Sequence, residues 1–175
     1  DPVWWFYLFW LPKYLSDVRG FTLTEIGLFA WMPYLSADLG SLFGGWVSGW
    51  RIGRGTPVIE ARRGTMIPFV LVMPIGIAVN YLPSTGALSV ICLVTFSHMA
   101  WKTNLMTMTN DIFPTEVVGS AAGVVGLGSG LAGAISTPVV GRVVDAFGYG
   151  AVFWMMGFLH LIAMGIVLAL VRKRA

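Results

Sequence analysis

Residues 151–171 read AVFWMMGFLHLIAMGIVLALV and are followed at once by Arg172, Lys173 and Arg174. The stretch carries no charged side chain, and as a helix it is long enough to cross a hydrocarbon core about 30 Å thick. Inside that core every backbone polar group must find its partner within the chain, which favours helices over open sheets. The segment therefore predicts a transmembrane helix that ends at a basic cluster.

Similar apolar stretches recur along the whole chain. Hydrophobic residues make up 57% of it and charged residues 11%, and the mean hydropathy is +0.79. These values exceed what a soluble domain of this size carries. We expect an all-α integral membrane protein, a bundle of six transmembrane helices at about 2–16, 24–50, 65–82, 87–110, 118–141 and 151–171. The first stretch is short for a span and lacks an initiator Met, so we expect a piece of a longer protein.

The basic residues predict how the bundle is oriented. Most of them follow the second helix or the last one, and these are Arg51, Arg54, Arg62, Arg63, Arg172, Lys173 and Arg174. Both places lie on one side of the predicted bundle, which the positive-inside rule makes cytoplasmic. A minority, Lys13, Arg19 and Arg142, falls on the other side. We therefore expect a cytoplasmic C-terminus and cytoplasmic loops at about 51–64 and 111–117.

Several classes of protein are disfavoured by the same composition. The net charge of +3 comes from basic residues that mark the orientation of the bundle in the membrane, so they do not form a basic face that could bind nucleic acid. The single Cys92 permits no intramolecular disulfide and indicates no metal cluster. A membrane enzyme would need a nucleophile with a base, or a metal set, and no such arrangement occurs at helical reach. We therefore expect no enzyme activity, cofactor or metal.

Ionisable residues inside the predicted helices are the strongest indications of function, since each is costly in lipid unless it is paired or hydrated. Asp38 lies roughly 21 Å below the start of its helix near Thr24, and Lys102 lies roughly 22 Å below Ala87. The two should share one depth. Our hypothesis is that Asp38 and Lys102 either pair across the bundle or face one water-filled cavity, and a structural pair is at least as favoured as binding of substrate or proton.

The fourth predicted helix groups several polar side chains. Ser97, Trp101 and Asn104 share one face at i, i+4, i+7 spacing, and His98 and Lys102 lie on its flank. A hydroxylated anion could place its carboxylate on the ammonium, a hydroxyl on the amide and a sugar face on the indole. The alternatives are that Trp101 packs in the core and that His98 forms a hydrogen bond between helices, which is the better interpretation of His98.

The first segment is rich in aromatic residues. Three of them share one face at helical spacing, and these are Tyr7, Trp10 and Tyr14. Pro12 leaves backbone groups without partners and predicts a bend, which suits a gate. Trp4 and Trp5 fit an interfacial aromatic belt better. Thr22 and Glu25 form a predicted capping box at the start of the second helix.

Glycines at small-xxx-small spacing mark the second and fifth predicted helices. They are Gly40, Gly44, Gly45, Gly49, Gly119, Gly123, Gly126, Gly130 and Gly133. Such spacing lets helix backbones approach closely. Packing inside one bundle is favoured over a dimerisation code. The third and sixth helices have few polar residues at mid-length and are typical of lipid-facing supports.

Four stretches, in this order, resemble the carboxyl-terminal half of major facilitator superfamily transporters: FWLPKYL at 9–15, ADLGS at 37–41, AWKTN at 100–104 and DIFPTEVVGS at 111–120. Within the superfamily the chain is similar to the anion:cation symporter family, and to its hexuronate and related sugar-acid transporters. The resemblance covers essentially the whole chain.

The resemblance implies two six-helix bundles around a central cavity, with substrate bound near the midplane and exposed alternately to each side. This chain would supply helices seven to twelve of a bacterial inner-membrane protein, and an amino-terminal half would be missing. The implied activity is proton-coupled symport of a small organic anion, most of all a hexuronate. The main coupling carboxylates belong to the missing half, which leaves Asp38 and His98 as secondary candidates here.

Residue by residue, the resemblance implies that Tyr7 and Trp10 face the cavity and that Trp101 and Asn104 touch the sugar acid. Lys102 stands where a small polar residue is expected, which leaves the exact substrate open. The family's gate region maps to residues 111–116.

Within that gate region the implied residues are Asp111, Pro114 and Glu116. The connection at 45–54 is similar to the superfamily's loop motif, but Gly49 replaces the usual acidic residue, so its salt bridge is not expected here.

Two other functions are compatible with the same fold: transport of another carboxylate, or a role as a non-transporting receptor or assembly subunit. A receptor would bind a labelled hexuronate without accumulating it in cells.

Overall fold

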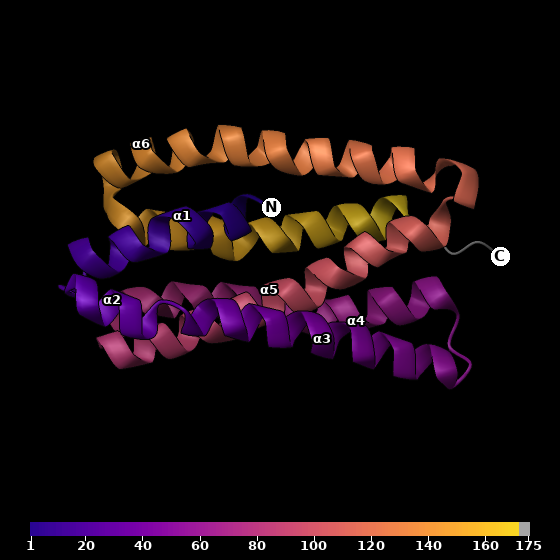
Figure 1. The fold of residues 1–175 in the computed structure, drawn as a ribbon, viewed down its shortest axis with the longest axis horizontal. Coiled ribbons are helices and arrows are strands. Elements are labelled where there is room, and N and C mark those ends of the chain that lie inside the picture. The colour runs from indigo at the N-terminus through magenta and orange to yellow at the C-terminus, as the bar shows by residue number, and fades with distance from the viewer. Residues whose placement is uncertain (172–175) are drawn as a thin grey trace.

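The computed structural model describes residues 1–171, and within that range the chain forms helices and short connections with no β-strand. Figure 1 shows the elements, which are α1 (Pro2–Asp17), α2 (Leu23–Phe29), α3 (Met32–Gly53), α4 (Val58–Val72), the 3-10 helix η1 (Met73–Tyr81), α5 (Ser84–Ile112) and α6 (Thr115–Leu170). Three segments are long and apolar enough to cross a membrane: Val58–Tyr81, Ser84–Ile112 and Thr115–Leu170. Residues 1–171 thus form an all-helical bundle with the segment lengths and apolar composition of a membrane protein.

The longest element, α6, consists of two arms that meet at Gly148. The backbone there has φ 76° and ψ 173°, outside the helical region and accessible mainly to glycine. Residues 115–147 form the first arm and residues 149–170 the second. The ribbon in Figure 1 doubles back between them. The first arm is longer than the helix expected at 118–141.

Prolines divide two helices that the apolar pattern predicts as continuous. The helix expected at 24–50 is interrupted between α2 and α3, because Pro33 has no N–H and its ring would clash with the carbonyl of Phe29 in an unbroken helix. The next helix tightens from α4 into η1 just before Pro74, which likewise cannot donate to the carbonyl of Val70.

Both predicted cytoplasmic loops are shorter than expected. The structure leaves only residues 54–57 between α3 and α4, where we expected a loop at 51–64, and only Phe113 and Pro114 of the expected 111–117 loop. Arginine is a good helix former, so the arginines at 51, 62 and 63 prolong α3 and α4 beyond the apolar segments. The apolar pattern marks the membrane core, whereas the helices continue past it.

The glycines of α3 allow close contact with α5. A methyl group on Gly40 or Gly44 would overlap backbone atoms of Phe96 or Ala100. This confirms the packing interpretation for these two glycines. On α6, Gly133 lies against the Trp5 indole and Gly141 against the Trp10 ring, which brings α1 and the first arm together.

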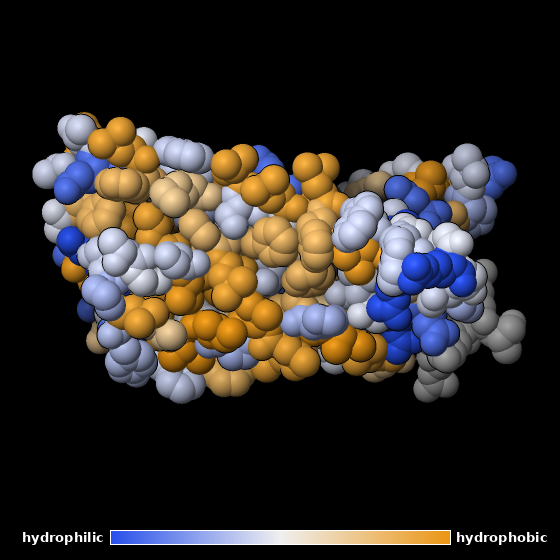
Figure 2. Space-filling view, turned by 90° about the horizontal axis from the view of Figure 1, so that it is seen from below, coloured by the Kyte–Doolittle hydropathy of each residue, from blue (hydrophilic) through white to orange (hydrophobic). Residues whose placement is uncertain are grey.

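Two buried apolar clusters hold the bundle together. One joins α1, η1, α5 and α6 around residues such as Phe6, Tyr14 and Phe153. The other joins α4, α5 and the second arm of α6 around Met66 and Trp101. Outside them the surface is apolar along its middle, and Figure 2 shows strongly hydrophilic residues gathered at the end where α3 meets α4.

Candidate functional site

The ammonium of Lys102 on α5 is paired with the carboxylate of Asp1, at the start of α1. Their side chains are 19% and 15% exposed, so the pair is largely shielded. Asp38 is exposed on α3 and forms no ion pair within residues 1–171. The paired form of our hypothesis is therefore wrong. Ala37 and Gly40 occupy the side of α3 that packs inward, which turns Asp38 away.

A histidine pair lies between α5 and the second arm of α6. His98 Nδ1 and His160 Nε2 are 2.9 Å apart, and both rings are buried. Trp4 stacks on His98 at a ring separation of 5.7 Å, and Trp101 meets His160 edge-on at 5.2 Å. The outer ring nitrogens of the two histidines have no hydrogen-bond partner in the described chain. His98 thus forms a hydrogen bond between helices, the alternative favoured by its sequence context.

Three of the predicted binding residues are packed between helices. Asn104 is fully buried, and its Nδ2 donates to the carbonyls of Gly44 at 3.0 Å and Ala100 at 2.9 Å. Tyr7 is 2% exposed and Trp101 is 5% exposed. The structure therefore does not bring the amide, the indole and the ammonium of α5 together on one open surface, because Asn104 faces α3 while Trp101 faces α6.

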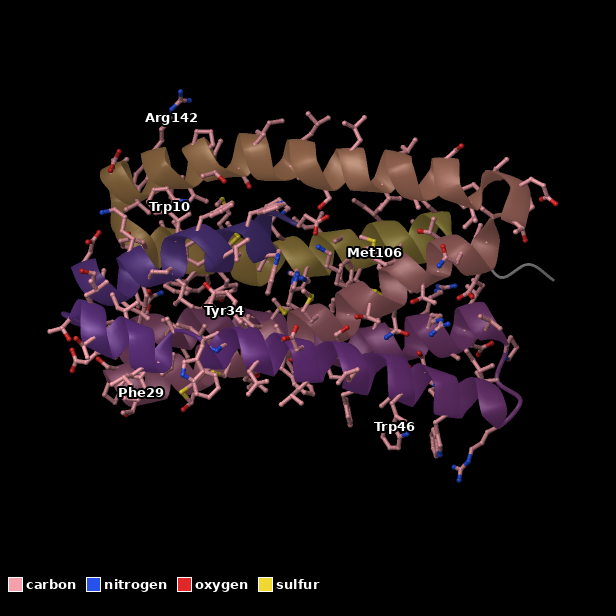
Figure 3. All side chains as sticks on the ribbon, viewed as in Figure 1. Trp10, Phe29, Tyr34, Trp46, Met106 and Arg142 are labelled. Atoms are coloured by element: carbon pink, nitrogen blue, oxygen red, sulfur yellow. The ribbon has the colours of Figure 1, made fainter. Side chains whose placement is uncertain are left out.

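Trp10 lies at a shallow, open cavity between α1 and the first arm of α6. The cavity has a volume of about 420 Å³ and is lined by Phe9, Trp10, Lys13 and Thr137. Figure 3 shows Trp10 directed toward α6. Its Nε1–H is buried without a hydrogen-bond partner in residues 1–171. Lys13 forms an exposed ion pair of 2.8 Å with Asp17.

Sequence reasoning missed two of these cavity residues and one histidine. Lys13 is one turn after Trp10 on the same helix, a spacing that could have indicated a shared face, but we used it only for topology. Thr137 comes from a distant helix and carries no local signal. His160 is the one ionisable residue within 151–171, and that isolation was a usable signal.

The predicted gate residues lie at the basic end of the bundle. Asp111 accepts a hydrogen bond of 3.1 Å from Arg62, whose Nη1 also donates to Ser48 Oγ at 2.8 Å. This network joins α5, α4 and α3. Pro114 directly precedes α6, and Glu116 lies in its first turn, where a negative charge favours the helix dipole.

At the opposite end of the bundle, Thr22 caps α2 as predicted. Its hydroxyl accepts from the Glu25 N–H, and its own N–H and hydroxyl donate to the Glu25 carboxylate, which confirms the capping box. These hydrogen bonds lower the pKa of Glu25 below its usual value, the one from the Thr22 backbone contributing most. Figure 3 shows Arg142 pointing outward at the same end.

The comparisons with known proteins agree with this architecture. Residues 2–137 match the Major Facilitator Superfamily. The hexuronate transporter of Escherichia coli (strain K12) is 30% identical over 164 residues, which are 93% of this chain and 38% of that protein. The D-galactonate transporter of Escherichia coli O6:H1 is 26% identical over 152 residues, 83% of this chain and 34% of that protein.

A further relative is the probable sulfoacetate transporter SauU of Cupriavidus necator, 29% identical over 163 residues, which are 89% of this chain and 36% of that protein. The chain thus spans between 34% and 38% of the length of these three relatives. The family match, in contrast, covers well over half of this chain. The chain belongs to the Major Facilitator Superfamily of membrane transporters.

Proposed function

We propose that the full-length protein containing this chain carries a hexuronate or related sugar acid across the membrane by proton-coupled, alternating-access symport. The chain is then the carboxyl-terminal six-helix half, with each arm of α6 serving as one span and an amino-terminal half supplying the other wall of the cavity. Family membership, the named substrates of two relatives and the short span relative to them support this proposal.

The cavity between α1 and the first arm of α6 is the observation that carries the proposal. A sugar acid presents a carboxylate, several hydroxyls and an apolar ring face. The cavity offers a hydroxyl from Thr137, a ring face from Trp10 and the ammonium of Lys13, which the substrate carboxylate would share with or take over from Asp17. A volume of about 420 Å³ falls within the range of small-molecule pockets, roughly 300 to 1,000 Å³.

Lys102 provides a second cation, deeper in the bundle. Its pairing with Asp1 supports a role in holding a carboxylate. In the proposed cycle the substrate carboxylate first meets the Lys13 ammonium and then moves along α1 to the Lys102 ammonium, where it replaces Asp1. Trp10 thus contacts the substrate in the cavity and Lys102 contacts it at the second position. Tyr7, Trp101 and Asn104 act as positioning residues that fix α1 and α5 against their neighbours.

Coupling and orientation complete the proposal. Asp38, exposed on α3, and His98, in the histidine pair, are the candidates within this chain for a proton-coupling role. The basic end holds the α3–α4 connection, and Arg63 on α4 donates to the carbonyl of Val171 after α6 at 3.0 Å, so the last described residue lies at this end as well. The basic residues expected after it, Arg172, Lys173 and Arg174, lie outside the described residues. We propose that this end is cytoplasmic in a bacterial inner membrane and that residues 111–116 form its gate.

Uptake by intact cells distinguishes a transporter from a receptor. Cells expressing the full-length protein should accumulate labelled glucuronate or galacturonate above the external concentration, and Trp10→Ala should abolish this. Trp154→Ala is the matched control, because Trp154 is 49% exposed on the second arm of α6, stacked on Phe158. Binding without accumulation would indicate a receptor. Accumulation of sulfoacetate alone would favour a different organic anion, as the Cupriavidus relative suggests.

A further inference from the structure

A second cavity, of about 430 Å³, opens at the basic end of the bundle. It lies where α3 ends, α4 begins and α6 ends. Arg51 and Arg63 line it. Val58, Ile67 and Leu168 line it as well, and each of these apolar side chains is nearly two-fifths exposed. The cavity therefore combines two guanidinium groups with an apolar wall open to the surroundings.

Arg51 lies over a glycine of the neighbouring helix. Both of its terminal nitrogens would be 2.6 Å from a methyl group placed on Gly64. Within residues 1–171 the Arg51 side chain has no hydrogen bond or ion pair to a protein group. The absence of a side chain at Gly64 thus lets an uncommitted guanidinium lie flat against α4 at the cavity.

The second arginine and the start of α4 add to the positive character of the site. Arg63 donates one hydrogen bond, from Nη1 to the carbonyl of Val171. No side chain caps α4 after Pro57, and the first residues of α4 line the cavity, so the positive end of the helix dipole adjoins it. Glu60 also lines the cavity and contributes one carboxylate against the two guanidinium groups. The balance remains positive.

We propose that this cavity binds an anionic phospholipid, with the phosphate on Arg51 and Arg63 and an acyl chain along Val58, Ile67 and Leu168. Basic pockets between transmembrane helices are suited to lipid phosphates, and the exposed apolar wall matches a chain from the surrounding bilayer. A free phosphate would use the arginines and leave the apolar wall unoccupied. The site is separate from the α1–α6 cavity and does not depend on the transported substrate.

Lipid titration of the purified full-length protein by native mass spectrometry tests the proposal. Phosphatidylglycerol should bind more tightly than phosphatidylcholine with the same acyl chains. Arg51→Gln and Arg63→Gln should each weaken phosphatidylglycerol binding about fivefold. Gly64→Ala keeps every charge and displaces only the flexible end of Arg51, so it should weaken binding similarly while the protein stays folded.

Arg54→Gln is the matched control. Arg54 is exposed near Arg51, but its guanidinium stacks 4.0 Å above the Trp50 ring and does not line the cavity. Arg54→Gln should leave the affinity for phosphatidylglycerol unchanged. If it weakened binding as much as Arg51→Gln does, the affinity would come from diffuse surface charge, and the proposed site would be overturned. Excess inorganic phosphate should not displace the lipid. Displacement would assign the cavity to a free anion and overturn the lipid proposal.

Discussion

The hydroxyl of Tyr34 on α3 lies 3.4 Å from the carbonyl oxygen of Leu8 on α1, to which it can donate a hydrogen bond. Leu8 is four residues before Pro12, so its carbonyl is the one that the missing N–H of Pro12 leaves without a helical partner. The same hydroxyl lies 3.3 Å from the carbonyl of Tyr7. A hydroxyl of one helix thus lies within hydrogen-bond reach of the backbone group that proline exposes in another, and it is shared with the adjacent Tyr7 carbonyl.

Tyr34→Phe should lower the free energy of unfolding by about 1 kcal/mol, because a shielded carbonyl loses its donor. Thermal unfolding of the full-length protein in detergent measures the loss. In a Pro12→Ala background the helix supplies its own donor to Leu8, so the effect of Tyr34→Phe should shrink. Tyr81→Phe, at an exposed position, is the control. An equal loss of unfolding free energy in both backgrounds would show that Tyr34 does not stabilise the protein through the carbonyl that Pro12 leaves unpaired.

Gly44→Ala should destabilise the protein by about 1 to 3 kcal/mol, because the added methyl overlaps the backbone of Ala100 and pushes α3 away from α5. The Asn104 hydrogen bond to the Gly44 carbonyl should lengthen as well. Unfolding of the purified protein measures the change. Gly165→Ala adds a methyl where nothing lies within 4 Å and should be neutral or slightly stabilising. Equal stability of the two variants would contradict close α3–α5 packing.

Breaking the Arg62–Asp111 pair should loosen the basic end of the bundle. Arg62→Gln and Asp111→Asn should each cost about 1 kcal/mol, since the pair is partly exposed, and the double variant should cost less than the sum of the two. Additive effects on unfolding would show that the two side chains do not couple. Under the proposed gate role, both variants should also change uptake rate more than substrate affinity.

The Thr22–Glu25 capping box should give acid-sensitive stability to α2. Because the folded pKa of Glu25 is lowered, its stabilising effect is present above the unfolded pKa of about 4.3 and is lost as pH falls through the folded value. Thr22→Ala removes the hydroxyl but keeps the backbone N–H, which contributes most, so it should raise the pKa of Glu25 only part of the way toward normal, as carboxyl NMR titration can measure. Thr22→Ser keeps the hydroxyl and should retain the low value. If the pKa of Glu25 stayed the same in Thr22→Ala, the backbone N–H of residue 22 alone would account for the lowered pKa, and the hydroxyl would make no contribution.

The helical, membrane-embedded character of the chain was predictable because apolar length depends on local sequence alone. The relative depth of side chains on different helices was not predictable, because it depends on how the helices pack: Gly40 lies against Phe96 and Gly44 against Ala100, which places Asp38 closer to the level of Phe96 than to that of Lys102. The direction in which a side chain points was not predictable either. Asp38 and Lys102 were expected at one depth, yet Asp38 points outward and Lys102 meets Asp1. Side-chain direction depends on which helix faces Gly40 and Gly44, a tertiary property.

The candidate site was only partly accessible to sequence reasoning for the same reason. Trp10 was identified from its aromatic surroundings and lies at the α1–α6 cavity. Thr137 was missed because α6 and α1 are far apart in the sequence and come into contact only in the folded bundle. Asn104 was identified as polar and at mid-depth, but its amide is engaged by the Gly44 carbonyl, which helical spacing on α5 cannot reveal.

Gradient-driven uptake in liposomes tests the proposed transport most directly. The full-length protein should be reconstituted and its uptake of labelled glucuronate measured with and without an inward proton gradient, for the parent protein, Trp10→Ala, Lys102→Met and the Trp154→Ala control. We predict accumulation that requires the gradient, is lost in the first two variants and is kept in the control. Folded protein that accumulates no sugar acid under either condition, or uptake unaffected by both Trp10→Ala and Lys102→Met, would contradict the account.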